Sequence, residues 1–379
     1  MSRFRRMIYV PVALLALCAI ASNTARAQIF DQFFDFGSVY TATNDTNGNE
    51  VQAYLRLPQG SLIAVGNTAT GGTGLGGGLG NQGGMTLSEN GRWLLVVNAG
   101  DNTVSVFLVG FLGELYLTDV EPSGGQTPVS VTIHNRSVYV LNGAGAGNIQ
   151  GFELSLFGDL VPLADSSRPL SGAATTAPAQ IQFSPSGDHL VVTEKATNVI
   201  DTYQIDGDGI AQGPLVQASN GVTPFGFDFN HNGTLVVSEA FGGAAGASAA
   251  SSYSLQGNGA LQTISASVPD FQSAACWIEI TRNGRFAYTT NTASGNISGY
   301  FINPFSGALS LLGNGVSAET GAGSGPIDVD LTTRGRFLYV LNSGTQEIMG
   351  FSVNSLNGNL SHAATVSDVP AGANGLIAR

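Results

Sequence analysis

One short stretch of this chain brings together residue types that can exchange protons. It is TEKATN, residues 193–198, where Glu194 precedes Lys195, the only lysine in the 379 residues. Glu239 stands at the matching position of the following repeat. Two carboxylates and an ammonium that converge can shift one another's pKa values and perform acid–base catalysis. Glu194, Lys195 and Glu239 are therefore the candidate catalytic residues; alternatively, both carboxylates only cap backbone amides, as asparagine does in other repeats.

An internal repeat supplies the elements that would position these residues. Short apolar segments end in Asn or Glu at intervals of 44 to 54 residues, and a period near fifty is typical of a four-stranded propeller blade. The segments end at Asn44, Asn98, Asn142, Glu194, Glu239, Asn291 and Asn342. Because the second-to-third-strand loops of all blades share one face of a propeller, the candidate residues are expected at the mouth of its channel.

Glycine-bearing turns separate the strands of each repeat, as in SENGR (88–92) and DGDGI (206–210). Such dipeptides supply the positive φ that tight hairpins need. The first repeat, starting at Ser38, lacks an inner strand, and residues 373–379 resemble one that has nothing after it. We predict an all-β, seven-bladed β-propeller over residues 38–379, with four-stranded blades and a ring closed by the C-terminal strand joining the N-terminal blade.

The N-terminal residues are typical of a signal peptide. A basic start is followed by the apolar run MIYVPVALLALCAIA, and Ala25-Arg26-Ala27 fits the small-x-small cleavage pattern. This predicts a signal peptide over residues 1–27, cleavage near Ala27, a lead-in over residues 28–37 and export to the periplasm or the extracellular space. A membrane anchor is the alternative, but the run is short for a span, so we expect none.

The charge of the chain limits its partners. Cleavage would remove four of the 14 basic residues and no acidic one, which leaves 10 basic against 26 acidic residues and a formal charge of −16. That charge repels nucleic acid, so no nucleic-acid partner is expected. Cys276 would be the single remaining cysteine, so no internal disulfide can form, and with no base predicted beside it we expect a buried, inert thiol.

No cofactor is expected, although calcium remains open. The histidines fall in turns or on an outer strand, too scattered for a histidine-rich metal site: His134, His189, His231 and His362. Matching inner-strand positions carry acidic side chains: Asp228, Glu279 and Asp330, with Asp328 close by. Their oxygens could bind calcium. Alternatively, they form hydrogen bonds between blades or pair with arginines in the nearby turns.

Two long loops are expected at the channel mouth, at residues 66–84 and 239–252. Long loops in compact domains are often functional. Both are so rich in glycine and alanine that they are either lids over a site or simple flexible insertions.

The repeats resemble those of a known family. YVLN (139–142 and 339–342), YTTN (288–291) and SPSG (184–187) are similar to the YVTN-type propeller repeat. Over about residues 38–379, the chain resembles the seven-bladed lactonase-like family, which includes relatives of 6-phosphogluconolactonase and carboxymuconate cyclase. The resemblance implies a seven-bladed propeller that hydrolyses or isomerises a small cyclic ester.

The chain departs from this family at one motif. The family often shows a GPRH-type start to one inner strand, and the matching stretch here is APAQ, residues 177–180. Pro178 and Glu194 match, but Ala179 and Gln180 replace the Arg-His pair, so that pair cannot act here.

Two functions remain open. One is a lactonase-like enzyme with Glu194 as base, Lys195 stabilising the oxyanion and Glu239 as a second acid–base group. The other is a non-catalytic propeller that binds a small ligand or a protein partner through the same loops.

Overall fold

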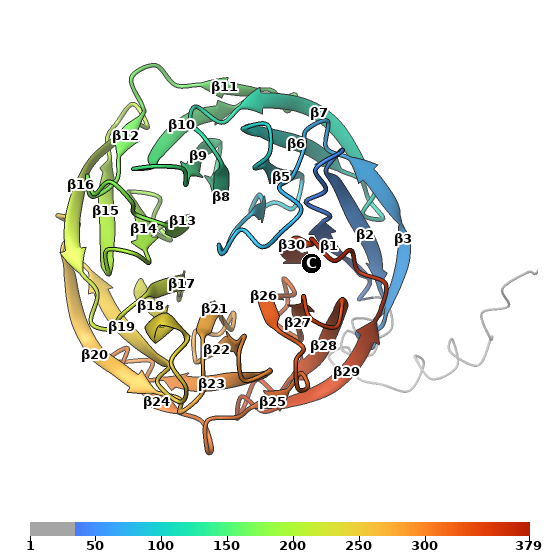
Figure 1. Cartoon of the computed structure of the whole chain (residues 1–379), viewed down its shortest axis with the longest axis vertical. Coiled ribbons are helices and arrows are strands. Elements are labelled where there is room, and N and C mark those ends of the chain that lie inside the picture. The colour runs from blue at the N-terminus through green and yellow to red at the C-terminus, as the bar shows by residue number, and fades with distance from the viewer. Residues whose placement is uncertain (1–34) are drawn as a thin grey trace, which may run out of the picture. The chain divides into compact units, whose positions relative to one another are not determined.

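Residues Gly37–Arg379 form seven antiparallel sheets arranged in a ring (Figure 1). The structure is a computed structural model that describes residues 35–379. In each sheet, the strand order runs from an inner strand at the channel to an outer strand at the rim. The predicted all-β seven-bladed propeller is confirmed. The predicted signal peptide, residues 1–27, lies outside the described residues, as do residues 28–34 of the lead-in.

We label the sheets as blades A to G. The strands of blade A are β1 (Gly37–Ala42), β2 (Glu50–Arg56), β3 (Leu62–Ala69) and β30 (Asn374–Ala378). Those of blade B are β4 (Met85–Leu87), β5 (Trp93–Asn98), β6 (Thr103–Val109) and β7 (Leu115–Pro122). Those of blade C are β8 (Pro128–His134), β9 (Ser137–Asn142), β10 (Asn148–Leu154), β11 (Leu160–Pro162) and β12 (Arg168–Pro169).

The second half of the chain forms the other four blades. Blade D has β13 (Pro178–Phe183), β14 (His189–Glu194), β15 (Val199–Ile205) and β16 (Ala211–Ala218). Blade E has β17 (Pro224–Phe229), β18 (Thr234–Glu239), β19 (Ala249–Leu255) and β20 (Leu261–Pro269), with the short 3₁₀ helix η1 (Phe241–Gly243). Blade F has β21 (Ala275–Ile280), β22 (Phe286–Asn291), β23 (Asn296–Ile302), β24 (Leu309–Leu311) and β25 (Ala318–Glu319). Blade G has β26 (Pro326–Leu331), β27 (Phe337–Asn342), β28 (Glu347–Val353) and β29 (Leu360–Val366).

Burial explains the apolar character of the repeats. The second strands are covered on both faces by neighbouring blades, so WLLVVN of β5 and HLVVTE of β14 are buried throughout. A strand buried on both faces is apolar almost continuously rather than alternately. The outer strand β3 lies at the rim and is mostly exposed.

The connections divide between the two faces of the ring. Those between blades and between second and third strands share one face, here called the loop face. The tight turns between first and second strands and between third and fourth strands share the opposite, turn face. Gly91 (φ 67°) and Gly209 (φ 79°) lie in such turns, in the left-handed region that glycine adopts without strain.

The C-terminal strand closes the ring, as predicted. β30 pairs with β1, with Tyr40 opposite Ile377. The backbones of Ser38 and Arg379 exchange two hydrogen bonds of 3.2 and 2.8 Å. This pairing gives blade A its inner strand, so the sheet edge at that seam is not left unpaired.

Two details differ from the predicted pattern. β1 ends at Ala42, and Asn44 lies beyond it with a φ of 53°. The strand of the first repeat therefore ends two residues before the predicted position, Asn44. The outer strands of blades C and F are each broken into two short pieces. Within residues 35–379, no helix is long and apolar enough to cross a membrane.

Candidate functional site

The glycine-rich loop between β3 and β4 enters the channel instead of covering it. In Figure 1 this connection projects into the middle of the ring. Its last residues, Gly80–Gly84, form what we call the plug, in which Asn81 and Gln82 are buried. The Gln82 amide donates to the carbonyl oxygen of Ala179 at 3.0 Å. Its side chain exchanges bonds of 2.8 and 3.0 Å with the backbone of Ile278.

Asn81 extends these contacts to other blades. Its carbonyl oxygen accepts a 2.6 Å hydrogen bond from the Trp277 indole, and its side-chain oxygen accepts a 3.0 Å bond from Asn374. Its side-chain amide donates to the Val129 carbonyl. The plug therefore bonds to the inner strands of blades A, C, D and F and obstructs the channel on the loop-face side.

Lys195 fastens the plug. Its ammonium donates to the carbonyl oxygens of Gly80 and, at 3.1 Å, of Pro178. It also lies 4.8 Å from the centre of the Phe225 ring, within the range of a cation–π contact. Burial lowers the pKa of Lys195 to about 8, because an ammonium is poorly solvated there.

Glu194 and Glu239 are fully buried and saturated with donors. Glu194 accepts from the Ser171 amide (2.8 Å), the Ser171 hydroxyl (2.7 Å) and the Thr197 hydroxyl (2.5 Å). Glu239 accepts from the Gly221 amide (2.9 Å) and from two hydroxyls, those of Ser251 and Ser267. Each carboxylate tethers the connection that precedes its own blade.

The three candidate residues do not converge in this structure. No ion pair joins Lys195 to either glutamate among the described residues, and the two glutamates bond to different segments. The geometry matches the capping alternative for Glu194 and Glu239, whereas Lys195 faces the plug. Their catalytic roles stay predictions.

Asp201 is a buried partner of Glu194 that the sequence analysis did not single out. It is fully buried on β15, and neither carboxyl oxygen has a hydrogen-bond donor. Burial, together with the neighbouring Glu194 carboxyl, raises its pKa to about 8. Alignment of the repeats could have revealed it, because serine occupies the same register in three other blades: Ser105, Ser251 and Ser298.

A cavity of about 360 Å³ occupies the channel beneath the plug. Gln82 and Gly83 of the plug form part of its lining, and residues 184–185 place its other end near the turn face. Side chains of the inner strands β4, β8, β13, β21, β26 and β30 line its wall. This volume lies in the range of small-molecule sites.

The acidic side chains of the inner strands mostly form hydrogen bonds between blades. Such bonds were one of the two roles predicted for them as alternatives to calcium binding. Asp228 accepts from the Ile280 amide of the next blade at 2.9 Å, and Asp330 accepts from the Ala378 amide at 2.6 Å. They satisfy amides on the free edges of inner strands, which have no further strand to pair with. Burial raises the pKa of Asp228 to about 6 and that of Asp330 to about 7.

Glu279 differs from the rest of this row. Of the described residues, only Gln82 hydrogen-bonds its carboxyl group, at 3.3 Å. Burial, and then repulsion from Asp228, Asp330 and Asp328, raises its pKa well above the ordinary value. The Glu279 carboxyl group therefore lines the cavity without a backbone amide to bind, in surroundings that favour its protonated form.

Within residues 35–379, no group of three or more His, Cys, Asp or Glu side chains has an arrangement that could hold a metal ion. His134 pairs with Glu89 at 2.9 Å, and His189 with Asp188 at 3.0 Å. Cys276 is buried, and burial raises the pKa of its thiol to about 12, which disfavours the nucleophilic thiolate.

The residues that replace the family's Arg-His pair make structural contacts. The Ala179 carbonyl accepts from the plug, and Gln180 exchanges hydrogen bonds of 2.7 and 2.9 Å with the backbone of Phe227. Gln180 also lines the channel cavity. At this position the wall is therefore an uncharged amide.

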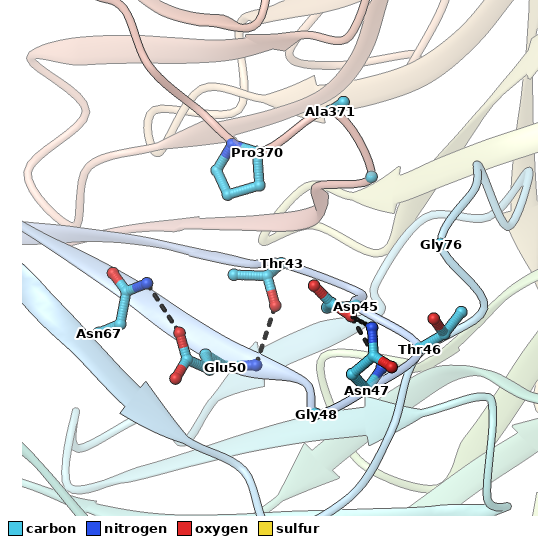
Figure 2. Close-up of a pocket in the computed structure, with 11 residues that line it drawn as sticks. Thr43, Asp45, Thr46, Asn47, Gly48, Glu50, Asn67, Gly76, Pro370 and Ala371 are labelled. Atoms are coloured by element: carbon cyan, nitrogen blue, oxygen red, sulfur yellow. Dashed lines mark hydrogen bonds between the residues drawn. The ribbon is translucent and has the colours of Figure 1, made fainter.

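A second cavity, of about 800 Å³, lies on the loop face of blade A (Figure 2). Figure 2 shows its polar groups bonded to one another: Asp45 accepts from Asn47, and Glu50 accepts from Asn67 at 2.9 Å. Residues 370–372 border it on the other side. Because its side chains satisfy one another, it offers fewer free groups than the channel does.

The seven antiparallel sheets define a seven-bladed propeller. Residues 248–375 match the family described as "Lactonase, 7-bladed beta-propeller". This match, together with the fold, confirms the resemblance that the repeats predicted. No curated protein sequence matches the chain significantly.

Solved structures share the fold at low sequence identity. A candidate 6-phosphogluconolactonase from Bacteroides uniformis is 19% identical with a TM-score of 0.72, and the alignment covers 90% of this chain and 100% of that one. The periplasmic gluconolactonase of Pseudomonas aeruginosa is 16% identical with the same TM-score, over 90% and 99% of the two chains. A candidate 6-phosphogluconolactonase from Bacteroides fragilis is 17% identical with a TM-score of 0.70, over 91% and 98%. At these identities the likeness concerns the fold.

Proposed function

We propose that this protein is an exported lactonase-like enzyme that hydrolyses or isomerises a small cyclic ester in the channel cavity. The family match and the names of the similar structures support the reaction class. The observation that carries the site is Glu279, whose carboxyl group lines a cavity of about 360 Å³ and is hydrogen-bonded, among the described residues, only by Gln82. Carboxyl groups with shifted pKa values in a cavity are typical of acid–base sites.

Ester hydrolysis needs one group that accepts a proton and one that donates it. Asp330, with a pKa of about 7, can take a proton from the attacking water near neutral pH. The water oxygen bonds to the carbonyl carbon, the ring C–O bond breaks, and Glu279 gives its proton to the departing ring oxygen. The two carboxyls influence each other, so the observed pKa values would belong to the pair.

The roles predicted from the sequence remain a rival assignment of the same reaction. In that assignment Glu194 is the base, Lys195 stabilises the oxyanion and Glu239 is the second acid–base group. It requires the buried glutamates to release the hydroxyl and amide donors that now saturate them.

Turnover of neutral sugar and aliphatic lactones by residues 28–379 tests both assignments, after subtraction of spontaneous hydrolysis. We expect Glu279→Gln to lower kcat by about 10²- to 10⁴-fold, the usual contribution of a general acid or base. Glu194→Gln also replaces a carboxyl group by an amide and is the matched control. We expect this variant to remain active if it folds. Loss of activity only in Glu194→Gln would favour the rival assignment, and circular dichroism checks that each variant folds.

A non-catalytic propeller that binds a small ligand or a protein partner is the second candidate. The saturated glutamates and the missing Arg-His pair favour it, because both remove groups that could perform catalysis. Absence of turnover on every lactone, in a folded protein, would support this function.

Export is part of the proposal and rests on the basic, apolar and small-residue pattern of residues 1–27. Expression of the full chain in a bacterial host, cell fractionation and N-terminal sequencing test it. We expect an exported product that begins near Gln28. A full-length product in the cytoplasm would contradict export.

A further inference from the structure

Acidic side chains predominate among the ionisable groups of the channel cavity, and the one histidine among them, His134, pairs with Glu89. The ionisable side chains that line it are Glu89, His134, Glu279, Asp328 and Asp330, and no arginine or lysine is among them. The one lysine of the chain bonds to Gly80, in the plug. A ligand in the cavity therefore meets carboxyl groups and meets no guanidinium or ammonium.

A phosphorylated or carboxylated ligand would be poorly held by such a wall. Phosphate and carboxylate sites in proteins use arginine, lysine or converging backbone amides. Here the backbone amides of Ile280 and Ala378 already donate to Asp228 and Asp330. An entering anion would lose its hydration and find carboxyl groups but no arginine or lysine to compensate for that loss, which penalises binding.

A second observation concerns the wall at Gln180. The resemblance to the lactonase-like family implies an Arg-His pair at Ala179 and Gln180, and Gln180 lines the cavity. Its side chain is held by the Phe227 backbone at 2.7 and 2.9 Å and donates to Gln182 at 3.0 Å. The position that matches the histidine of the related motif therefore carries an uncharged amide that is already hydrogen-bonded, and the position that matches its arginine is Ala179.

We infer that the cavity takes an uncharged, hydroxyl-rich or cationic small molecule and excludes anionic ones, so that the cyclic ester of the proposed function is an unphosphorylated lactone. This inference rests on the proposed function for the reaction, but the choice of ligand charge follows from the cavity wall. Carboxyl oxygens accept hydrogen bonds from sugar hydroxyls and from ammonium groups. The volume of about 360 Å³ suits a molecule of monosaccharide size.

The test compares ligands that differ only in charge. Glucono-δ-lactone and its 6-phosphate are the substrate pair, and kcat/KM is measured for each after subtraction of the spontaneous reaction. We expect at least a 100-fold preference for the neutral lactone. Equal or faster turnover of the phosphate would overturn the inference while leaving the proposed function standing.

If neither lactone is turned over, that result counts against the proposed function but not against the inferred ligand charge. Binding measurements then test the ligand charge. The probes are 1-deoxynojirimycin, a cationic sugar analogue, 1-deoxyglucose as its neutral match, and 6-phosphogluconate as the anion, each titrated by calorimetry. We expect the amine to bind at least tenfold more tightly than the neutral sugar, and the anion not to bind. Binding of the anion, or of none of the three, would overturn the inference.

A charge variant links the preference to this wall. Gln180→Arg places a cation on the cavity wall and should reduce the preference for the neutral over the phosphorylated lactone at least tenfold. Gln180→Met, of similar length and uncharged, is its matched control and should keep the preference. An unchanged preference in folded Gln180→Arg would show that this wall does not set ligand charge.

Discussion

The hydroxyl of Tyr339 donates a 2.6 Å hydrogen bond to the carbonyl oxygen of Gly60, which joins the last blade to the first. The same bond recurs between other neighbouring blades: Tyr40 to Gly113 (2.9 Å), Tyr139 to Gly209 (2.9 Å) and Tyr288 to Gly358 (2.7 Å). Each acceptor lies in the turn between the third and fourth strands of the following blade. The tyrosine of the repeated phrase is therefore a tie between blades and gives no information about the reaction.

Loss of one such tie should destabilise the ring. Tyr339→Phe leaves the buried Gly60 carbonyl without its donor, so we expect the free energy of unfolding to fall by about 1–3 kcal/mol. Urea denaturation followed by tryptophan fluorescence measures the change. Tyr116→Phe removes an exposed hydroxyl on β7 and is the control. Equal stability of the two variants would refute a stabilising role for the tie.

Removal of the Lys195 ammonium should loosen the plug. In Lys195→Met the Gly80 and Pro178 carbonyls lose a charged hydrogen-bond donor. We therefore expect the equilibrium constant for local opening of the plug to rise about tenfold or more. Hydrogen exchange of the Gln82 amide, which donates to Ala179, reports on this opening. The internal reference is the Thr70 amide, which begins the same connection and donates to the carbonyl oxygen of Asn49 in the loop between β1 and β2. Unaltered exchange at Gln82 would mean that Lys195 does not fasten the plug.

Asp201 should make the protein less stable as the pH rises. Its folded pKa of about 8 lies above the ordinary value of 3.8, so the folded state holds a proton that the unfolded state has released. The stability contribution is complete below pH 4 and is lost progressively up to pH 8. Asp201→Asn should flatten the dependence of unfolding free energy on pH between 5 and 8. Asp208→Asn, in an exposed turn, should leave it as in the wild type; a similar slope in both variants would contradict this role.

The proposed reaction should depend on pH through Asp330. With a pKa of about 7, its carboxylate becomes available as a base only as the pH rises through neutrality, whereas burial and the neighbouring carboxyl groups raise the pKa of Glu279 well above its ordinary value. We expect kcat/KM on a neutral lactone to increase between pH 6 and 8 and this rise to vanish in Asp330→Asn. Retention of the rise in the folded variant would exclude Asp330 as the base.

The fold could be predicted because its signals are local. Glycines that need positive φ, such as Gly209, recur from repeat to repeat, and a tyrosine that ties two blades recurs in four of the seven repeats. The site could not be predicted in the same way. Gln82 bonds to Ile278, 196 residues away, and nothing within a glycine-rich loop indicates that its end fills a channel.

The carboxylates show a second limit of prediction from sequence. Glu194 replaces asparagine at a conspicuous position, yet its partners are Ser171 and Thr197, which satisfy it as a cap. Glu279 looks like one member of an acidic row, and only the three-dimensional arrangement shows that it lacks a backbone donor. Residue type and spacing identified the acids, but the distribution of hydrogen-bond donors decides which of them is free.

The position of β30 also affects the timing of folding. Blade A needs an inner strand that leaves the ribosome after every other strand, because Ile377 pairs with Tyr40. At about 5–20 residues per second, the interval between synthesis of these two partners is on the order of tens of seconds. During that time the nascent ring stays open at one seam. Because closure pairs strands from the two ends of the described residues, blade A is completed only after the strands of the other six blades have been synthesised.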